Sequence, residues 1–370
     1  MVELYGAALV AISIAISAIL SSRLRISSAI FEVVAGIILG NLLGVKLESW
    51  LDFLGTYGGL VLTFLAGAEV EFHILRKKAK ASLVIGSLAF IAPLIAEFLF
   101  LSIVTNWTLQ AKISVGLALT TTSVAVVYAI LTEYEIIKLP ASRIIIAVTF
   151  VNDILTLIGI NLISPSFDVY VIVTFFTLIG ILIIAIPKLL GHIVERYGRR
   201  AVEMELRFIL ASMLGVAVLA DVAKLHAVFG AFVLGLVFAS TIQKYQDVLS
   251  KMRTVTFSLL SPAFFIRAGL LIGLPAVIQN IALIMGLLAV KLLSKFAGTY
   301  LLSKKWIDES AGMFSALLFS TGLTVGSITA TLARDLHFID QTQFSVAIVT
   351  VILSAIVPTL LAKRFVPQKI

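Results

Sequence analysis

Residues 143–163 read Arg143-Ile-Ile-Ile-Ala-Val-Thr-Phe-Val-Asn-Asp-Ile-Leu-Thr-Leu-Ile-Gly-Ile-Asn-Leu-Ile163. This run is long enough to cross a bilayer as a helix, and Asp153 lies near its middle. An ionised side chain at that depth costs at least about 2.5 kcal/mol, so such residues are usually functional. Asn152 is next to Asp153, and Thr149 lies one helical turn before it on the same face. The stretch therefore predicts a membrane-spanning helix with a polar site inside the bilayer.

The composition places the whole chain in the same class. The chain has 370 residues, of which 60% are hydrophobic and 13% charged, whereas a soluble domain is about 25% charged. Apolar runs of about 20 residues recur along it, and the short alternating segments of a transmembrane β-barrel are not evident. The first run lacks a basic leader, so we expect a retained helix rather than a cleaved signal. There is no cysteine, which excludes disulfides and thiolate chemistry.

The apolar runs predict an all-α polytopic membrane protein with 13 transmembrane helices. Lys and Arg gather in alternate connections, whereas the opposite connections carry only Lys46, Lys112, Lys224 and Arg334. This bias places the N-terminus outside and the C-terminus in the cytoplasm. It also accounts for the net charge of +8 without a nucleic-acid partner. The predicted spans are 5–20, 27–45, 51–68, 82–104, 111–131, 142–163, 168–189, 205–222, 227–239, 254–273, 276–301, 310–332 and 342–362.

Two of these spans contain stretches that weaken a helix. The fifth contains Thr120-Thr-Thr-Ser123 and the twelfth contains Ser320-Thr-Gly-Leu-Thr-Val-Gly326. Hydroxyl side chains compete for backbone hydrogen bonds, and glycine relaxes the helix. Each stretch is in the middle of a group of three spans, 82–163 and 276–362, and the two helices cross in opposite directions. The pattern predicts an inverted repeat with two discontinuous helices, as in secondary transporters. The alternative is continuous helices whose glycines allow close packing.

Six short motifs carry a resemblance to one transporter family. They are Glu32-Val-Val-Ala-Gly-Ile-Ile-Leu-Gly40, Phe64-Leu-Ala-Gly-Ala-Glu-Val-Glu71, Thr121-Thr-Ser123, Gly230-Ala-Phe-Val-Leu-Gly235, Pro262-Ala-Phe-Phe-Ile-Arg-Ala-Gly269 and Lys295-Phe-Ala-Gly298. Together they resemble the monovalent cation:proton antiporters of the second cation:proton antiporter family, which contains NapA-type Na+/H+ exchangers and Kef-type K+ systems. The resemblance runs over nearly the whole chain. It implies the NhaA/NapA-like fold, in which two discontinuous helices cross.

The resemblance also implies different roles for different segments of the chain. Residues 1–70 and 205–273 would form the scaffold and dimerisation helices, one to three and eight to ten. Residues 82–163 and 276–370 would form the core transport helices, four to six and eleven to thirteen, and 168–204 would hold the linker helix. The family implies a homodimer in the cell membrane. Its core moves against the scaffold and so carries the site between the two faces.

The residues around Asp153 suit exchange of a cation for a proton. Removing a carboxylate from water penalises its charged form, so a proton can compete with a cation for it. A small hard cation such as Na+ prefers oxygen ligands, and no cofactor is expected. The alternative is an aspartate paired permanently with a lysine for structural reasons. The predicted ion- and proton-binding residues are Asp153, Asn152, Thr149, Thr121, Thr122 and Ser123.

Many relatives carry Asp-Asp where this chain has Asn152-Asp153, and in them the first carboxylate pairs with the lysine that Lys295 resembles. Asn152 cannot supply that charge, so we expect one-for-one, electroneutral exchange. The glutamate that the electroneutral sister family places before its Ser/Thr is Val148 here, so the motif is mixed. Lys295 could approach Asp153, neutralise the negative ends of the broken helices or extend to the cytoplasm. Lys291, one turn away, competes for the same role.

The expected function is Na+ (or Li+)/H+ antiport, and the alternative is a K+/H+ antiporter or K+ efflux system. Kef-type systems usually carry a nucleotide-binding domain that this sequence does not contain, which favours Na+. A channel or symporter on the same fold is a further alternative. An enzyme is disfavoured, because the four histidines fall in or near connections and no His-Glu-x-x-His or Gly-x-Gly-Asp motif occurs. Glu97 is expected to face the protein interior, and Arg267 to line the domain interface or extend to the membrane surface.

Overall fold

The computed structural model describes residues 2–24, 27–69, 78–136, 139–163, 203–222, 227–242 and 246–367, with isolated positions between 170 and 196. The predicted seventh span and linker helix (168–204) lie almost entirely outside these residues. Over the described ranges the ordered elements are all helices. Seven helices, counted in the described part of the chain, are long and apolar enough to cross a membrane by length and composition. The chain is therefore a helical, multi-pass membrane protein.

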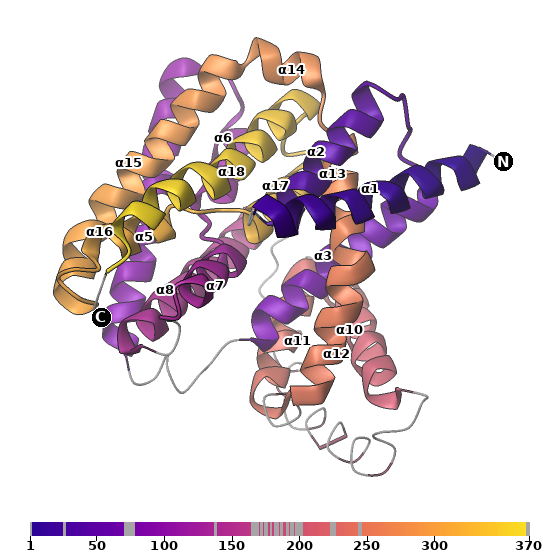
Figure 1. Cartoon of the computed structure of the whole chain (residues 1–370), viewed down its shortest axis with the longest axis horizontal. Coiled ribbons are helices and arrows are strands. Elements are labelled where there is room, and N and C mark those ends of the chain that lie inside the picture. Colours follow the sequence, from indigo (N-terminus) through magenta and orange to yellow (C-terminus); the bar gives the residue numbers. More distant parts are fainter. Residues whose placement is uncertain are drawn as a thin grey trace. The chain divides into compact units, whose positions relative to one another are not determined.

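Contacts divide the chain into two compact units, and the first comprises Met1–Glu48, His73–Ile160 and Phe265–Ile370. Its helices lie in three parts of the chain (Figure 1). They are α1 (Val2–Leu24), α2 (Ser28–Asn41), α5 (Ala79–Val104), α6 (Leu109–Thr120), α7 (Val124–Glu133), α8 (Pro140–Leu162), α13 (Ser261–Leu270), α14 (Leu274–Gln279), α15 (Ile281–Trp306), α16 (Gly312–Phe319), α17 (Thr324–Asp335) and α18 (Gln341–Ala362).

Helices α2 and α13 cross at glycines. A Cβ atom added to Gly36 would lie 2.3 Å from the carbonyl oxygen of Ile266, and one added to Gly269 would lie 2.2 Å from that of Val33. Real Cβ atoms do not approach backbone this closely, so only glycine permits the contact. Both glycines belong to motifs that carry the family resemblance, and this packing is their physical reason.

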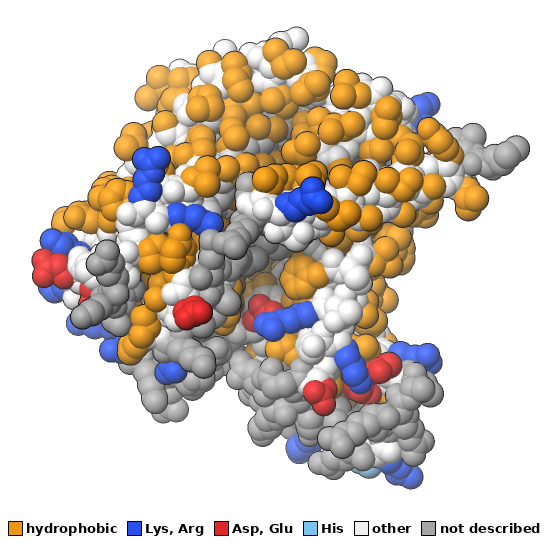
Figure 2. Space-filling model, viewed as in Figure 1, with side chains coloured by type: hydrophobic (Ala, Val, Ile, Leu, Met, Phe, Trp, Pro, Cys, Tyr) orange, Lys and Arg blue, Asp and Glu red, His pale blue; other side chains and the backbone are white. Residues whose placement is uncertain are grey.

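Apolar side chains also cover the outward faces of the first unit. Hydrophobic side chains occupy broad areas of the surface that Figure 2 draws. Such a surface would be unfavourable in water, but it suits contact with lipid chains. The exposed apolar residues include Ile12, Ile16 and Ile19 of α1, Ile91, Ile95 and Leu99 of α5, and Ile281, Met285 and Leu293 of α15.

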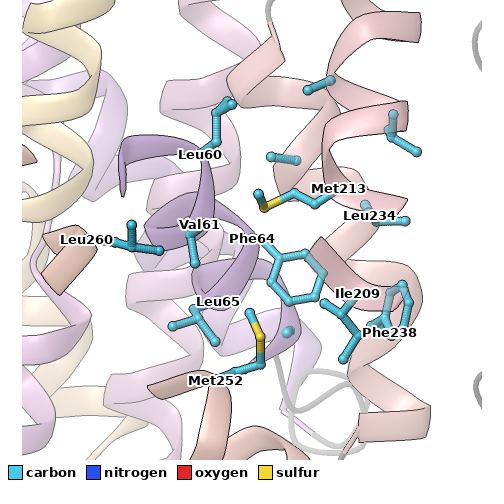
Figure 3. Packing of buried hydrophobic residues seen from close by; sticks show 14 of the residues in the cluster. Leu60, Val61, Phe64, Leu65, Ile209, Met213, Leu234, Phe238, Met252 and Leu260 are labelled. Carbon is cyan, nitrogen blue, oxygen red and sulfur yellow. The ribbon is translucent and has the colours of Figure 1, made fainter. Parts of the chain in front are cut away.

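The second unit comprises Ser49–Phe72 and Asn161–Phe264. Its helices α3 (Ser49–Ala68), α10 (Met204–Val222), α11 (Ala227–Ile242) and α12 (Gln246–Val255), with the π-helical turn η1 (Thr256–Leu260), surround one apolar core. Phe64 and Phe238 meet edge to face there, with ring centroids 5.6 Å apart (Figure 3). A Cβ on Gly67 would lie 2.3 Å from the carbonyl oxygen of Phe232, and this explains the glycine of the third-span motif.

Charged side chains gather at one end of the second unit. Lys251 Nζ donates to Glu203 Oε2 at 2.6 Å and to Glu205 Oε1 at 3.1 Å. Arg253 Nη2 lies 2.8 Å from Glu69 Oε1. The sequence places these residues on the predicted cytoplasmic side, where a charged helix end is easily hydrated.

The described helices follow most predicted spans to within a few residues. The fifth and twelfth spans are each two helices, α6–α7 and α16–α17, separated at 121–123 and 320–323. The tenth span differs, because its helical structure begins earlier, with α12 and η1 before α13. The two units group α1 and α2 with the helices of 82–163. The division into scaffold and core concerns movement and stays a prediction.

Candidate ion-binding site

The first interruption, at 121–123 between α6 and α7, arises from hydroxyl side chains that donate hydrogen bonds to carbonyl oxygens of their own helix. Thr120 Oγ1 donates to the carbonyl oxygen of Leu117 at 2.8 Å, and Thr121 Oγ1 donates to that of Ala118 at 3.0 Å. Such bonds compete with the next helical turn. Ser123 Oγ then accepts from the backbone N–H of Val126 at 3.3 Å, which caps the start of α7. The chain therefore leaves the helix and re-enters it within three residues.

The second interruption, at 320–323 between α16 and α17, also has hydroxyl side chains that bond back to their own helix. Ser320 Oγ donates to the carbonyl oxygen of Ala316 at 2.9 Å, and Thr321 Oγ1 donates to that of Leu318 at 2.7 Å. The following helix, α17, approaches α6 very closely. A Cβ on Gly326 would lie 2.7 Å from Thr121 Oγ1, so a glycine is required at this position.

The two interruptions contact each other directly. The backbone N–H of Ser123 donates to the carbonyl oxygen of Thr321 at 3.0 Å. Thr122 Oγ1 donates to the carbonyl oxygen of Phe319 at 2.8 Å. The polar groups released by each broken helix are thus partly satisfied by the other, as the membrane interior requires.

Lys295 donates hydrogen bonds to both interruptions, and the place where they meet is called the junction. Its side chain is fully buried. The Nζ atom donates to the carbonyl oxygen of Thr121 at 2.9 Å, to Thr122 Oγ1 at 2.8 Å and to the carbonyl oxygen of Phe319 at 2.8 Å. All three ammonium hydrogens are therefore used. Two of the acceptors are carbonyls at the negative ends of α6 and α16. Of the three locations considered from the sequence, the side chain occupies the one at the helix ends.

Asp153 and Asn152 lie within α8, buried in the first unit. Asp153 is 2% exposed, and its Oδ1 atom accepts no hydrogen bond from the residues that the structure describes. The side-chain oxygen and nitrogen of Asn152 also lack partners among those residues. Asp153 and Lys295 attract each other electrostatically but form no direct ion pair.

Thr149 and Thr156 flank the pair on α8. Thr149 Oγ1 donates to the carbonyl oxygen of Ile146 at 2.6 Å, and the oxygen keeps lone pairs for a cation. Thr156 Oγ1 donates to the carbonyl oxygen of Asn152 at 3.0 Å and lies 3.0 Å from Thr120 Oγ1. Thr156 therefore links α8 to the first interruption. Sequence reasoning missed it, although its spacing of one turn from Asn152 was a usable signal.

The remaining predicted residues fall at separate places. Arg267 of α13 is 5% exposed, and its Nη2 atom lies 3.5 Å from Asp335 Oδ2 at the end of α17. Lys291 and Glu97 are fully buried, as expected for Glu97. No group of three or more His, Cys, Asp or Glu that could hold a metal occurs among the described residues.

Comparison with known proteins gives a family and a fold. The family model described as "Sodium/hydrogen exchanger, transmembrane" matches residues 9–366. The chain is 24% identical to the "Probable Na(+)/H(+) antiporter 3" of Methanocaldococcus jannaschii, over 90% of this chain and 89% of that protein. It is 26% identical to the "Na(+)/H(+) antiporter" of Enterococcus hirae, over 96% of each.

A solved structure has a similar fold. The sodium proton antiporter MjNhaP1 from Methanocaldococcus jannaschii at pH 8 superposes with a TM-score of 0.73 and 14% identity, covering 98% of this chain and 97% of that one. This likeness supports the fold alone.

Proposed function

The chain belongs to the sodium/hydrogen exchanger family, and from this premise we propose that it exchanges Na+ or Li+ for a proton at Asp153. The narrower assignment to the second cation:proton antiporter family goes beyond that match, which is to the sodium/hydrogen exchangers. One observation carries the proposal. A buried carboxylate with an unpaired oxygen lies in the same unit as two helix interruptions joined by a lysine.

Asp153 would bind a proton and a cation alternately. Its unpaired Oδ1 has lone pairs for either ligand, and occupation by one removes the charge that attracts the other. The oxygens of Asn152, Thr149 and the 121–123 segment would complete the shell of a hard cation. Lys295 would stay charged throughout, because three acceptors hold it. One ligand then replaces another of equal charge, and exchange is one for one and electroneutral.

The two interruptions would belong to an inverted repeat of 13 helices whose broken helices cross. Short helices allow the junction to re-form its few hydrogen bonds in a second arrangement, which alternating access requires. The proposed topology places the protein in the plasma membrane with the N-terminus outside. The helices of 1–70 and 205–273 would form the scaffold of a homodimer, 168–204 would hold the linker helix, and the helices of 82–163 and 276–370 would form the moving core.

Proton movement in proteoliposomes tests the proposal. Na+, Li+ and K+ are added separately to acid-loaded vesicles that contain a quenched pH dye. Na+ and Li+ should restore fluorescence, Asp153→Asn should abolish the response, and the exposed control Asp247→Asn should retain it. Exchange that survives Asp153→Asn would overturn the site. No response in the wild-type protein would overturn the function.

K+ is the competing cargo, because oxygen ligands also suit it and the motifs resemble Kef-type systems too. A larger response to K+ than to Na+ in the same vesicles would assign the protein to K+/H+ exchange. Imposing a membrane potential tests the stoichiometry. A rate of exchange that changes with the potential would contradict the one-for-one ratio.

A further inference from the structure

A second buried acid and base lie in the first unit, and the exchange reaction above does not use them. Glu97 is on α5 and Lys291 is on α15, and neither side chain is exposed. Helix α5 packs along α15, where a Cβ on Gly286 would lie 2.5 Å from the Phe100 ring and one on Gly298 would lie 3.0 Å from Ala92 Cβ. Glu97 and Lys291 lie between these two contacts, but they form no direct ion pair. Buried charges that are not in contact stabilise each other poorly, so this pair needs an explanation.

The surroundings of Glu97 favour its neutral form. Neither carboxylate oxygen accepts a hydrogen bond from any described residue. The nearest turn of α6 presents Gly116, where an added Cβ would lie 3.9 Å from the Glu97 Cβ atom. A buried carboxylate without donors is costly when ionised, whereas a carboxylic acid is much less so.

The surroundings of Lys291 hold its charge less firmly than those of Lys295. Lys291 Nζ donates one hydrogen bond among the described residues, to Ser354 Oγ at 2.8 Å, whereas Lys295 Nζ donates three. A Cβ on Gly322 would lie 2.4 Å from Lys291 Nζ, so the amine reaches the second interruption. That point precedes the N-terminus of α17, where the helix dipole repels a cation.

Lys291 lies near the proposed ion site. A Cβ on Gly322 would lie 2.4 Å from Lys291 Nζ and 3.1 Å from Thr121 Oγ1, an oxygen of the proposed cation shell. Lys291 makes no hydrogen bond to any of the proposed ion ligands among the described residues. Its influence on Asp153 is therefore electrostatic rather than a shared ligand.

We propose that Glu97 and Lys291 form a second proton-binding pair, separate from Asp153, whose protonation controls the cation affinity of the Asp153 site. This inference rests on the proposed exchange at Asp153. The other charged side chains on the packed helices are Lys80 on α5, Lys112 on α6, Arg143 and Asp153 on α8, and Lys295, Lys304 and Lys305 on α15; α14, α16 and α18 carry none. Lys291, rather than any of these groups, is the electrostatic partner of Glu97.

The sign of the effect follows from the charges. When Glu97 is a neutral acid and Lys291 is protonated, the pair carries a net charge of +1, which repels a cation at Asp153. Loss of one proton from the pair, from either group, leaves it with no net charge and raises the affinity of the site for the cation. The affinity for Na+ should therefore increase with pH in two stages, one for Asp153 and one for the pair.

The test measures the apparent KM for Na+ against pH in proteoliposomes for four proteins. Wild type should show both stages, and the second should change the KM on the order of ten-fold, a usual coupling between two linked sites. Lys291→Met should abolish the second stage. Glu97→Gln should move it to higher pH, because the amide has no carboxyl proton to release and only the proton on Lys291 is left to be lost. Lys304→Met, at the exposed end of the same helix, should leave the profile unchanged.

The outcomes separate this inference from the proposed function. Normal Na+/H+ exchange with the same pH profile in wild type, Lys291→Met and Glu97→Gln would overturn the pair and leave the function standing. Absence of exchange in the wild type would overturn the function itself. If Lys291→Met does not fold, Glu97→Gln decides alone, since an unshifted second stage would refute the inference.

Discussion

Replacing Lys295 with methionine removes the group that joins the two interruptions. The ammonium donates to three acceptors at 2.8 to 2.9 Å, two of them backbone carbonyls. Methionine is similar in length but offers no hydrogen, so the carbonyl oxygen of Thr121 and Thr122 Oγ1 lose this donor, and the carbonyl oxygen of Phe319 keeps only the bond from Thr122 Oγ1. A hydrogen bond to a charged group contributes about 1.5–3 kcal/mol, and loss of one partner from a buried charged cluster costs about 3–5 kcal/mol. We expect the free energy of unfolding to fall by about 3–5 kcal/mol.

Two variants on the same helix provide a comparison for the stability lost in Lys295→Met. Lys291→Met breaks one hydrogen bond and should cost about 1.5–3 kcal/mol, and Lys304→Met breaks a surface ion pair worth about 0–1 kcal/mol. Unfolding in mixed micelles with increasing dodecyl sulfate measures all three. Equal losses of unfolding free energy in Lys295→Met and Lys291→Met would refute the reasoning, because the two additional hydrogen bonds of Lys295 would then contribute nothing to stability.

Three other variants have expected outcomes. Gly326→Ala would place a methyl group 2.7 Å from Thr121 Oγ1, so it should cost about 1–3 kcal/mol and slow exchange, whereas Gly215→Ala, which meets open space, should change the unfolding free energy by less than about 1 kcal/mol. Asn152→Asp adds a second carboxylate beside the site, so exchange should become sensitive to membrane potential; an unchanged, potential-independent rate would argue against Asn152 as the residue that sets the ratio. Hydrogen bonds to Glu203 and then to Glu205 raise the pKa of Lys251 above its ordinary value. The stability lost in Lys251→Met should therefore be full below about pH 10 and disappear as the pH rises through the raised pKa, and a difference that persists at higher pH would contradict this assignment.

The local signals in the sequence predicted the interruptions well. The Thr120–Ser123 run and the Ser320–Gly326 run contain residues whose side chains compete with helical hydrogen bonds, and both helices break within them. The length of each apolar run likewise predicted where most helices begin and end. These features depend on neighbouring residues, which is why a single sequence reveals them.

The arrangement of the site could not be derived in the same way. Lys291 and Lys295 are one turn apart and both fully buried, so only the packing of α15 decides which one reaches the helix ends. The sequence offered three places for Lys295 with no means of choosing. Thr156 links α8 to the first interruption through contact with Thr120, and Arg267 lies beside Asp335, 68 residues further along the chain. Such long-range contacts depend on tertiary structure.

Release of protons by the purified protein tests the central claim most directly. Na+ is added to the wild-type protein in weakly buffered detergent solution, and the pH is followed with Asp153→Asn and the control Asp247→Asn beside it. If Asp153 exchanges a proton for a cation, Na+ should acidify the wild-type and Asp247→Asn solutions but not the Asp153→Asn solution. Equal acidification by Asp153→Asn would contradict the account, because the exchanged proton would then come from another group.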